Sequence, residues 1–225
     1  MPNSKKKSIF IVVPAYNEEK RLASVIKDLQ KYHYSIIVID DASSDKTWSI
    51  LSNFDIFKLR HKINRGQGAT LQTGTHFALK SGAEIIVHFD GDGQFLTSEI
   101  EKSIEPILNS NFDIVLGSRF LKENKIPFLK RYFILPVSKI INYFLTGLKL
   151  TDAHCGFRAM SRQAAQKINI TQDGMSHNTE IVAQIKKLKL KYKEVPITVI
   201  YHEFGQPISG GFKILKELFL GKLIK

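Results

Sequence analysis

Short apolar runs alternate with segments of helical spacing in the first half of this chain, and this alternation restricts its fold more than any other feature. Each run has the length of a strand and is apolar almost throughout, which is typical of a strand buried on both faces. Strands that alternate with helices predict an α/β fold with a mostly parallel central sheet flanked by helices. The runs are residues 9–13, 36–39, 85–89 and 114–116, and the helical stripes between them are Leu22, Val25, Ile26 and Leu29; Trp48, Leu51 and Phe54; and Leu71, Thr75, Ala78 and Leu79.

A polar cluster follows each apolar run. The clusters are residues 14–18, 40–44, 90–94 and 117–119. In an open parallel sheet, ligands bind beyond the carboxyl ends of the strands. We therefore expect the four clusters to line a single crevice.

The cluster after the run 85–89 has the composition of a cation site. Asp90 and Asp92 alternate with Gly91 and Gly93, and Gln94 follows. Carboxylate and amide oxygens suit Mg²⁺ or Mn²⁺, and glycine lets the backbone approach a charged ligand. An acidic, solvated turn is the alternative for this segment taken alone.

The second half has a less regular pattern. We expect an amphipathic helical segment over 128–148, a loop or hairpin over 151–161 and an edge strand over 192–201 that contains Pro196. Basic amphipathic helices are predicted over 177–190 and 210–225, and Ser98 with Glu101 predicts a capping box that opens a helix through Leu108.

Length and charge limit the class of protein. The 225 residues suit one α/β domain, and the net charge of +12 points to an anionic partner. The single Cys155 fits a reducing compartment, and the short apolar runs predict neither a signal peptide nor a transmembrane helix. We therefore expect a cytoplasmic protein. A nucleic-acid-binding module would explain the charge too, but it does not explain acids at strand ends, so nucleic acid is not an expected partner.

Five motifs in order resemble family 2 glycosyltransferases of the GT-A fold, in particular the dolichol-phosphate mannosyltransferase-like branch. They are residues 13–19 (VPAYNEE), 40–43 (DDAS), 90–94 (DGDGQ), 117–119 (GSR) and 155–158 (CGFR). The resemblance covers about residues 9–201. It implies transfer of a sugar from a nucleotide-diphosphate donor with inversion, by a single domain over 1–225. Residues 1–118 would form the half that binds the nucleotide sugar, and residues 119–225 the half that binds the acceptor.

The resemblance also implies roles in donor binding. Asp41 would contact the base, uracil or guanine, while Asp40 supports the loop. Asp90, Asp92 and Gln94 would hold Mg²⁺ or Mn²⁺, which neutralises the departing diphosphate. Other donor-site residues would be Pro14, Ala15, Tyr16, Asn17, Glu18, Gly68, Gly91 and Arg158.

Several of these residues have structural alternatives. Asn17 could cap the first helix, Asp40 and Asp41 could cap a helix that begins near Ser44, and the glycine-rich turn 64–69 could serve close helix–sheet packing. Backbone N–H groups at that turn could instead face an anion. Arg158 could brace the loop 152–157 or pair with Asp152.

Three further residues have predicted acceptor or catalytic roles. The resemblance implies that Arg119 and Arg131 hold the phosphate of a polyprenyl-phosphate acceptor, although Arg131 could also be a snorkelling surface residue. Together with Asp92, these arginines and Glu180 form the predicted catalytic set; Glu180 could also be a solvated helix carboxylate. His154, His177 and His202 lack the spacing of a zinc site.

The identity of the acceptor stays open between two classes. A phosphate acceptor needs no general base, and the chain has no Glu-Asp pair of the kind that many hydroxyl-using relatives carry, which favours a polyprenyl phosphate. Near the C-terminus Gly205 and Ser209 match the polyprenyl-phosphate enzymes, but Gly210 stands where lysine is expected. The form of this segment, Gly-Gln-x-x-Ser, is more similar to the corresponding segment of relatives in bacterial polysaccharide assembly, where the acceptor would be a sugar hydroxyl.

The basic helix predicted over 210–225 bears on localisation. Its lysines alternate with apolar side chains, a pattern that predicts a helix lying on an anionic membrane surface at the cytoplasmic face. Packing on the body of the protein or a homodimer contact is the alternative.

Overall fold

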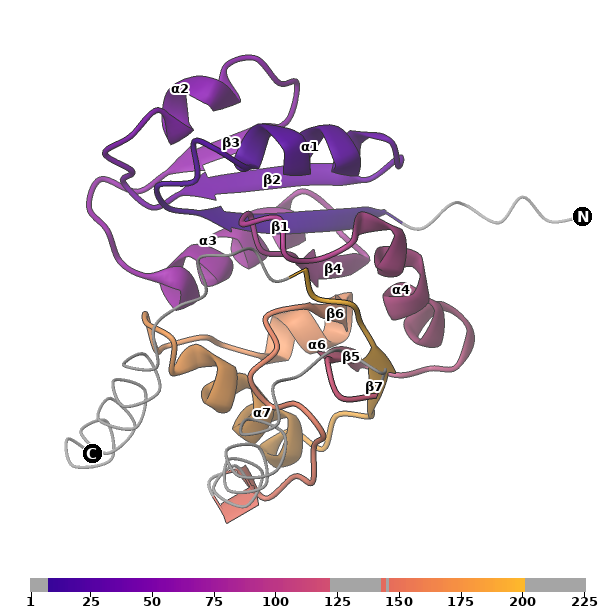
Figure 1. Cartoon of the computed structure of the whole chain (residues 1–225). Helices are drawn as coiled ribbons and strands as arrows, with labels where there is room; N and C mark the ends of the chain where they lie inside the picture. The colour runs from indigo at the N-terminus through magenta and orange to yellow at the C-terminus, as the bar shows by residue number, and fades with distance from the viewer. Residues whose placement is uncertain (1–7, 122–142, 145, 201–225) are drawn as a thin grey trace, which may run out of the picture.

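The computed structural model describes residues 8–121, 143–144 and 146–200. Seven strands form one sheet in the order β3-β2-β1-β4-β6-β5-β7, and Figure 1 shows them side by side. All neighbours pair in parallel except those of β6, which runs antiparallel to both β4 and β5. The mostly parallel α/β fold expected from the alternation is therefore confirmed.

The elements follow one another in the expected alternating order. The strands are β1 (Ile9–Ala15), β2 (Ser35–Asp40), β3 (Phe57–Arg60), β4 (Ile85–His88), β5 (Ile114–Ser118), β6 (Arg158–Ser161) and β7 (Tyr192–Pro196). The helices are α1 (Leu22–Gln30), α2 (Thr47–Leu51), α3 (Gln67–Lys80), α4 (Ile100–Asn109), α6 (Arg162–Lys167) and α7 (His177–Lys187), with a 3₁₀ turn, η1 (Thr97–Glu99), before α4.

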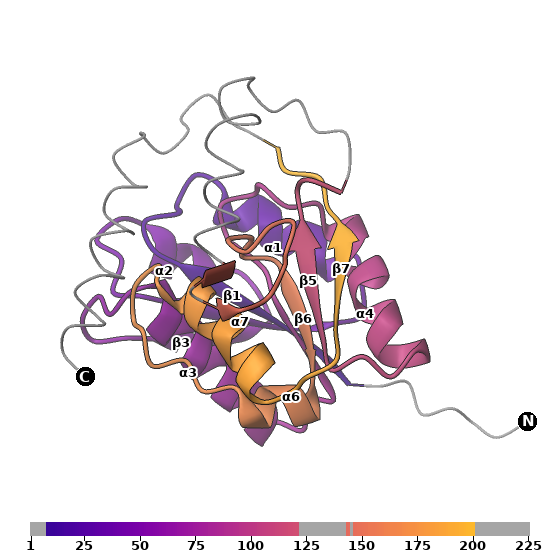
Figure 2. The same ribbon diagram turned by 90° about the horizontal axis from the view of Figure 1, so that it is seen from below.

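Two apolar cores lie on opposite faces of the sheet. Side chains alternate along a strand, so Ile11 and Val13 of β1 enter one core while Phe10 and Val12 enter the other. The first core contains buried residues of α1, α2 and α4, and the second contains those of α3, α6 and α7. Figure 2 shows α4 and α7 on opposite sides of the neighbouring strands β5 and β7. The stripe at residues 22, 25, 26 and 29 is the buried face of α1.

Three elements do not match the expectations for their segments. Residues 158–161 form the internal strand β6, although a loop or hairpin was expected over 151–161, and no element was predicted for residues 162–167, which form α6. Sheet neighbours on both sides, rather than an apolar run, make Arg158–Ser161 a strand. The edge strand β3 was not predicted because Phe-Lys-Leu-Arg contains no continuous apolar stretch.

The expected capping box at Ser98 and Glu101 is wrong. Helix α4 begins at Ile100 after η1, and no side chain caps it. The carboxylate of Glu99 instead turns inward and accepts hydrogen bonds from the backbone N–H (2.7 Å) and the hydroxyl (2.8 Å) of Thr198. A tertiary contact has therefore replaced the local cap.

The edge strand β7 is confirmed, but it ends at Pro196 rather than at residue 201. The chain then crosses to the loop after β4. Val199 forms an antiparallel bridge with Phe95, and the Ile200 N–H donates to the carbonyl of Gln94 (2.9 Å). Residues 197–200 therefore support the loop 90–94, which carries the predicted cation ligands.

Several expectations fall outside the described residues. They concern Arg131, most of the helical segment 128–148, the Gly205–Gly210 departure and the basic helix 210–225. Within the described ranges, no helix has the length and apolarity that a membrane span requires.

Candidate active site

The two acids at the end of β2 each bind a basic residue at the end of the neighbouring strand β3. Asp40 forms an ion pair with the Arg60 Nε (2.8 Å), and the next acid, Asp41, binds the His61 Nδ1 (2.6 Å). Arg60 also lies over the ring of Trp48. These contacts offset the repulsion between the adjacent carboxylates. They do not cap α2, because that helix begins at Thr47 and its N-cap is Lys46.

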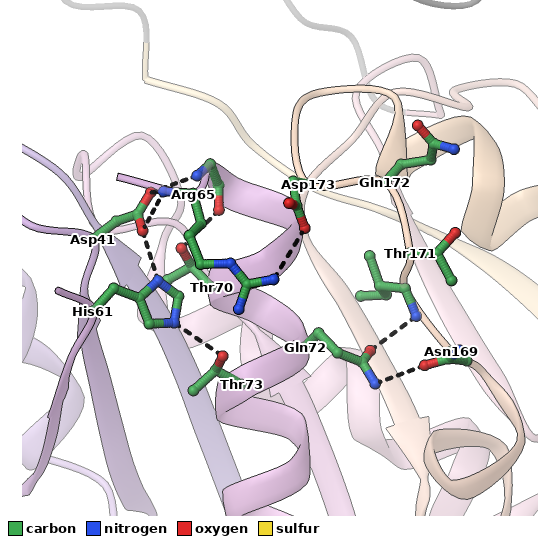
Figure 3. Close-up of polar contacts among 12 residues, drawn as sticks. Asp41, His61, Arg65, Thr70, Gln72, Thr73, Asn169, Thr171, Gln172 and Asp173 are labelled. Atoms are coloured by element: carbon green, nitrogen blue, oxygen red, sulfur yellow. Dashed lines mark hydrogen bonds and ion pairs between the residues drawn. The ribbon is translucent and has the colours of Figure 1, made fainter. Parts of the chain in front are cut away.

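Asp41 also binds the start of α3, as Figure 3 shows. Its carboxylate accepts hydrogen bonds from the backbone N–H groups of Arg65 (3.0 Å) and Gly66 (2.6 Å). Gly66 has φ = 99°, a conformation that glycine adopts without strain. The turn 64–69 therefore does face an anion, but the anion is the protein's own carboxylate.

Gly68 contacts a loop of the second half of the chain rather than the sheet. Its N–H donates to the carbonyl of Asp173 (2.7 Å), and a Cβ at this position would lie 2.0 Å from the carbonyl oxygen of Gln172. Glycine is needed here because two backbones approach closely.

Glu180 holds the same loop from the other side. Its carboxylate accepts from the N–H of Thr171 (3.1 Å), from the hydroxyl of Thr171 (2.5 Å) and from the N–H of Gln172 (2.9 Å). Gln72 adds contacts to Asn169 (3.2 Å) and to the N–H of Ile170 (2.9 Å), the first of which is seen in Figure 3. These contacts give Glu180 a structural task, and its catalytic role stays a prediction.

The loop after β1 is fastened to the loop after β2. The side-chain oxygen of Asn17 accepts from the Ser44 N–H (3.0 Å), and the Asn17 N–H donates to the Ser43 hydroxyl (2.9 Å). Asn17 has φ = 55°, which asparagine tolerates. It does not cap α1, whose N-cap is Arg21. Asn17 therefore shapes the loop that carries Tyr16.

Two carboxylates near Asp92, those of Asp90 and Glu18, have raised pKa values. Burial and then the nearby charge of Asp92 raise the pKa of Asp90 to about 7. The pKa of Glu18 is raised by the same two causes in the same order. The Gln67 side chain donates to Asp90 (2.8 Å), and the Gln94 N–H donates to Asp92 (3.0 Å). The mutual repulsion of these acids is what a bound divalent cation would relieve.

The donor atoms at this position suit Mg²⁺ or Mn²⁺. Asp90, Asp92 and Gln94 offer the hard oxygens that these cations prefer, and all three line one cavity. Gly156 closes the space behind Asp90, since a Cβ there would lie 2.5 Å from Oδ2. Among the described residues, no group of three His, Cys, Asp or Glu side chains could hold a metal, so a cation site at this position would have to include the amide of Gln94.

Arg119 is held by an acid that we had considered a partner for Arg158. Its Nε (2.6 Å) and Nη2 (2.8 Å) both donate to the carboxylate of Asp152, in a bidentate pair. Asp152 is held in turn, because Glu194 accepts from its N–H (3.1 Å). The alternative pairing of Asp152 with Arg158 is therefore wrong.

Arg158 is buried in β6 beneath the cavity. Its guanidinium donates to the carbonyl of Cys155 (2.9 Å) and to the side-chain oxygen of Asn178. Burial lowers its pKa to about 10, and the neighbouring charge of Asp90 acts against this shift. It does brace the Cys155 end of the loop 152–157, one of the two alternatives, and it does not line the cavity.

A single cavity of about 650 Å³ brings most of the predicted residues together. Asp40, Asn17, Gly68, Arg158 and Glu180 are not among its lining residues, and Arg131 lies outside the described part of the chain. The predicted residues that do line it are Pro14, Ala15, Tyr16, Glu18, Asp41, Asp90, Gly91, Asp92, Gln94 and Arg119.

The cavity also contains residues that the sequence reasoning missed. They include His154, Met175 and Val199, whereas Asn64 and Gln67 belong to the glycine-rich turn 64–69 that the sequence had singled out. His154 had been considered only as a zinc ligand, although it stands inside the segment 152–158 that carries the CGFR motif. Burial lowers its pKa below the usual value for histidine. Its position in that segment was the one signal that could have identified it.

The fold and the cavity define the class of protein as an α/β enzyme of the GT-A type, with an acidic ligand site beyond the carboxyl ends of the strands. Glucosyl-3-phosphoglycerate synthase from Mycobacterium tuberculosis, crystallised with Mn²⁺, UDP and its product, shares this fold. The TM-score is 0.72 at 15% identity, over 95% of this chain and 77% of that one.

Residues 10–169 match the family Glycosyl transferase family 2, so the chain belongs to that family and is a glycosyltransferase. It is similar to an uncharacterised protein of Methanocaldococcus jannaschii, with 39% identity over 97% of this chain and 93% of that protein. It is also similar to UDP-N-acetylglucosamine–dolichyl-phosphate N-acetylglucosaminyltransferase of Methanococcus voltae, with 35% identity over 97% of this chain and 98% of that enzyme.

Proposed function

We propose that this enzyme transfers a sugar, with inversion, from a UDP-linked donor to the phosphate group of a polyprenyl phosphate. The observation that carries the proposal is the single cavity in which Tyr16 and Asp41 lie with the acids Asp90 and Asp92 and with Arg119. A base-binding end, a cation site and a guanidinium are the three parts that this reaction requires. The full-length likeness to the M. voltae enzyme supports both the donor and the acceptor class.

The donor half of the cavity is built from the first four strands. Tyr16 and Asp41 would bind the base and ribose, and Asp90, Asp92 and Gln94 would hold Mg²⁺ or Mn²⁺. When bound, the cation supplies charge neutralisation for the departing diphosphate. A GDP-linked donor is the alternative, since both uracil and guanine present a ring N–H to a carboxylate.

The acceptor would enter beside Arg119. An acceptor phosphate oxygen attacks the anomeric carbon, a new carbon–oxygen bond forms, and the bond to the nucleoside diphosphate breaks with its electrons on the diphosphate. Because a phosphate dianion carries no proton to remove, this step needs positioning charges rather than a base. Arg119, oriented by its bidentate contact to Asp152, would supply one such charge. Arg131 is proposed as a second.

A sugar hydroxyl is the second candidate acceptor, and His154 is the observation that favours it. A hydroxyl nucleophile must lose its proton, and an imidazole kept neutral by burial could accept that proton in the cavity. Under this alternative His154 would be the general base.

The proposed acceptor also implies where the enzyme acts. A polyprenyl phosphate resides in a membrane, so we propose association with the cytoplasmic membrane surface through the basic C-terminal segment. The alternative is that the same segment forms a homodimer contact instead of binding the membrane.

Transfer assays with matched acceptors test the proposal. The full chain is incubated with radiolabelled UDP-N-acetylglucosamine, UDP-glucose or GDP-mannose, with Mn²⁺ or EDTA, and with polyprenyl phosphate or the corresponding polyprenol. We expect cation-dependent transfer to the phosphate only. Asp92→Ala should abolish it, whereas Asp28→Ala, which removes an exposed acid of α1 paired with Lys31, should not. Transfer to a glycan hydroxyl that His154→Gln abolishes would favour the second candidate instead.

A further inference from the structure

The carboxyl ends of β2 and β3 are joined by two successive acid–base pairs, and only one of them reaches the cavity. Asp40 pairs with Arg60 and Asp41 with His61, one residue further along both strands. Asp41 lines the cavity, whereas Asp40, Arg60 and His61 do not. We propose that His61 is a positioning residue for donor recognition, which orients the carboxylate of Asp41 toward the nucleobase. This inference rests on the proposed function, because it takes a nucleotide as the ligand.

The hydrogen bonds of Asp41 leave it little freedom. A carboxylate has about four acceptor positions. The N–H groups of His61, Arg65 and Gly66 occupy both oxygens of Asp41, and the Arg65 N–H is shared between them (3.0 and 3.2 Å). About one acceptor position therefore remains for a ligand in the cavity. A ring N–H such as those of uracil and guanine fits that position, because it donates one hydrogen bond.

Among the described residues, His61 supplies the side-chain hydrogen bond to the Asp41 carboxylate, and a second contact fixes the His61 ring from the opposite side. Its Nε2 lies 3.0 Å from the hydroxyl of Thr73 on α3, and its side chain is only 10% exposed. The carboxylate of Asp41 requires a proton on Nδ1, so a neutral ring accepts from Thr73 through Nε2. Figure 3 shows the line from Asp41 through His61 to Thr73. Without His61, Oδ1 of Asp41 would keep only the shared N–H of Arg65, whereas Oδ2 would keep the short contact to Gly66.

The neighbouring pair provides a matched control. Arg60 at the end of β3 pairs with Asp40 at the end of β2, so it connects the same two strands as His61 does. Its loss should weaken this connection without removing any hydrogen-bond donor of Asp41. If His61 merely stabilises the strand ends, a change at Arg60 should have the same effect on nucleotide binding as a change at His61. If His61 acts through Asp41, only the change at His61 should matter.

Calorimetric titration of the full chain with UDP and Mn²⁺ tests the inference. We expect His61→Ala to weaken UDP binding about tenfold, since a hydrogen bond to a charged group that orients a ligand contact is lost. His61→Asn, which places a side-chain N–H near the position of Nδ1, should recover most of the affinity. Arg60→Gln should bind as the wild type does. In transfer assays His61→Ala should raise KM for the donor and leave kcat nearly unchanged.

A double-variant cycle decides whether His61 acts through Asp41. Asp41→Asn combined with His61→Ala should bind UDP no more weakly than Asp41→Asn alone. Additive losses, wild-type affinity in His61→Ala, or an equal loss in Arg60→Gln would overturn the inference. Thermal melts identify variants that fail to fold, in which case His61→Asn and Thr73→Val replace His61→Ala. Wild-type protein that binds UDP without transfer to polyprenyl phosphate overturns only the acceptor proposal, whereas protein that binds neither UDP nor GDP overturns both.

Discussion

Asp90→Asn should remove a pH dependence from the stability of the metal-free enzyme. Burial and the charge of Asp92 raise the pKa of Asp90 from 3.8 to about 7 in the folded protein. Between these two values the folded state binds the proton that the unfolded state has released, so stability falls as pH rises. The stability contributed by the protonated Asp90 is fully present below about pH 4 and has been lost once the pH passes about 7.

The size of this effect follows from the same two values. Each pKa unit corresponds to about 1.4 kcal/mol, which gives up to about 4 kcal/mol for the whole window. Asp90 retains some exposure on its cavity side, so solvent screening reduces the expected loss to about 2 kcal/mol. The asparagine amide keeps the oxygen that accepts from Gln67 and carries no charge at any pH.

Denaturant unfolding of both proteins from pH 4 to pH 8 in EDTA measures the difference directly. The wild type should lose about 2 kcal/mol relative to Asp90→Asn across this range, because groups remote from Asp90 titrate equally in both proteins. Mn²⁺ should restore stability at pH 8 more than at pH 6, since cation binding requires the ionised carboxylate. Parallel stability curves for the two proteins would refute the reasoning.

Three further variants test single contacts. Gly68→Ala should destabilise the fold by about 1–3 kcal/mol in denaturant unfolding, because its Cβ would meet the carbonyl of Gln172 at 2.0 Å; unchanged stability would contradict the close approach. Glu180→Gln should lower stability by about 1–2 kcal/mol and kcat by less than tenfold, whereas a general base would cost about 100-fold or more. Asp152→Asn should raise KM for the polyprenyl phosphate more than KM for the donor, since it releases Arg119; equal changes in the two constants would argue against a role at the acceptor.

The alternating pattern was enough to predict the sheet and its covering helices. The run 9–13 forms β1, and the stripe from Leu22 to Leu29 is the buried face of α1. Both patterns are local, because the spacing of the apolar residues alone decides which side of the element is buried. The strand-end rule then placed Tyr16, Asp41 and Asp92 in one cavity before any contact was known. Strand β6 was missed because Arg158–Ser161 is a strand only when β4 and β5 stand on either side.

By itself, the sequence determined the α/β fold, the edge of the sheet that binds ligands and the residue types gathered there. It did so because apolar periodicity and strand-end position are properties of neighbouring residues. Only the tertiary structure decided how charged side chains are partnered: Arg119 rather than Arg158 binds Asp152, Glu180 holds a loop, and Asp41 is held by His61 and the start of α3. Those choices depend on which segments meet across the sheet, and sequence separation carries no record of such distances.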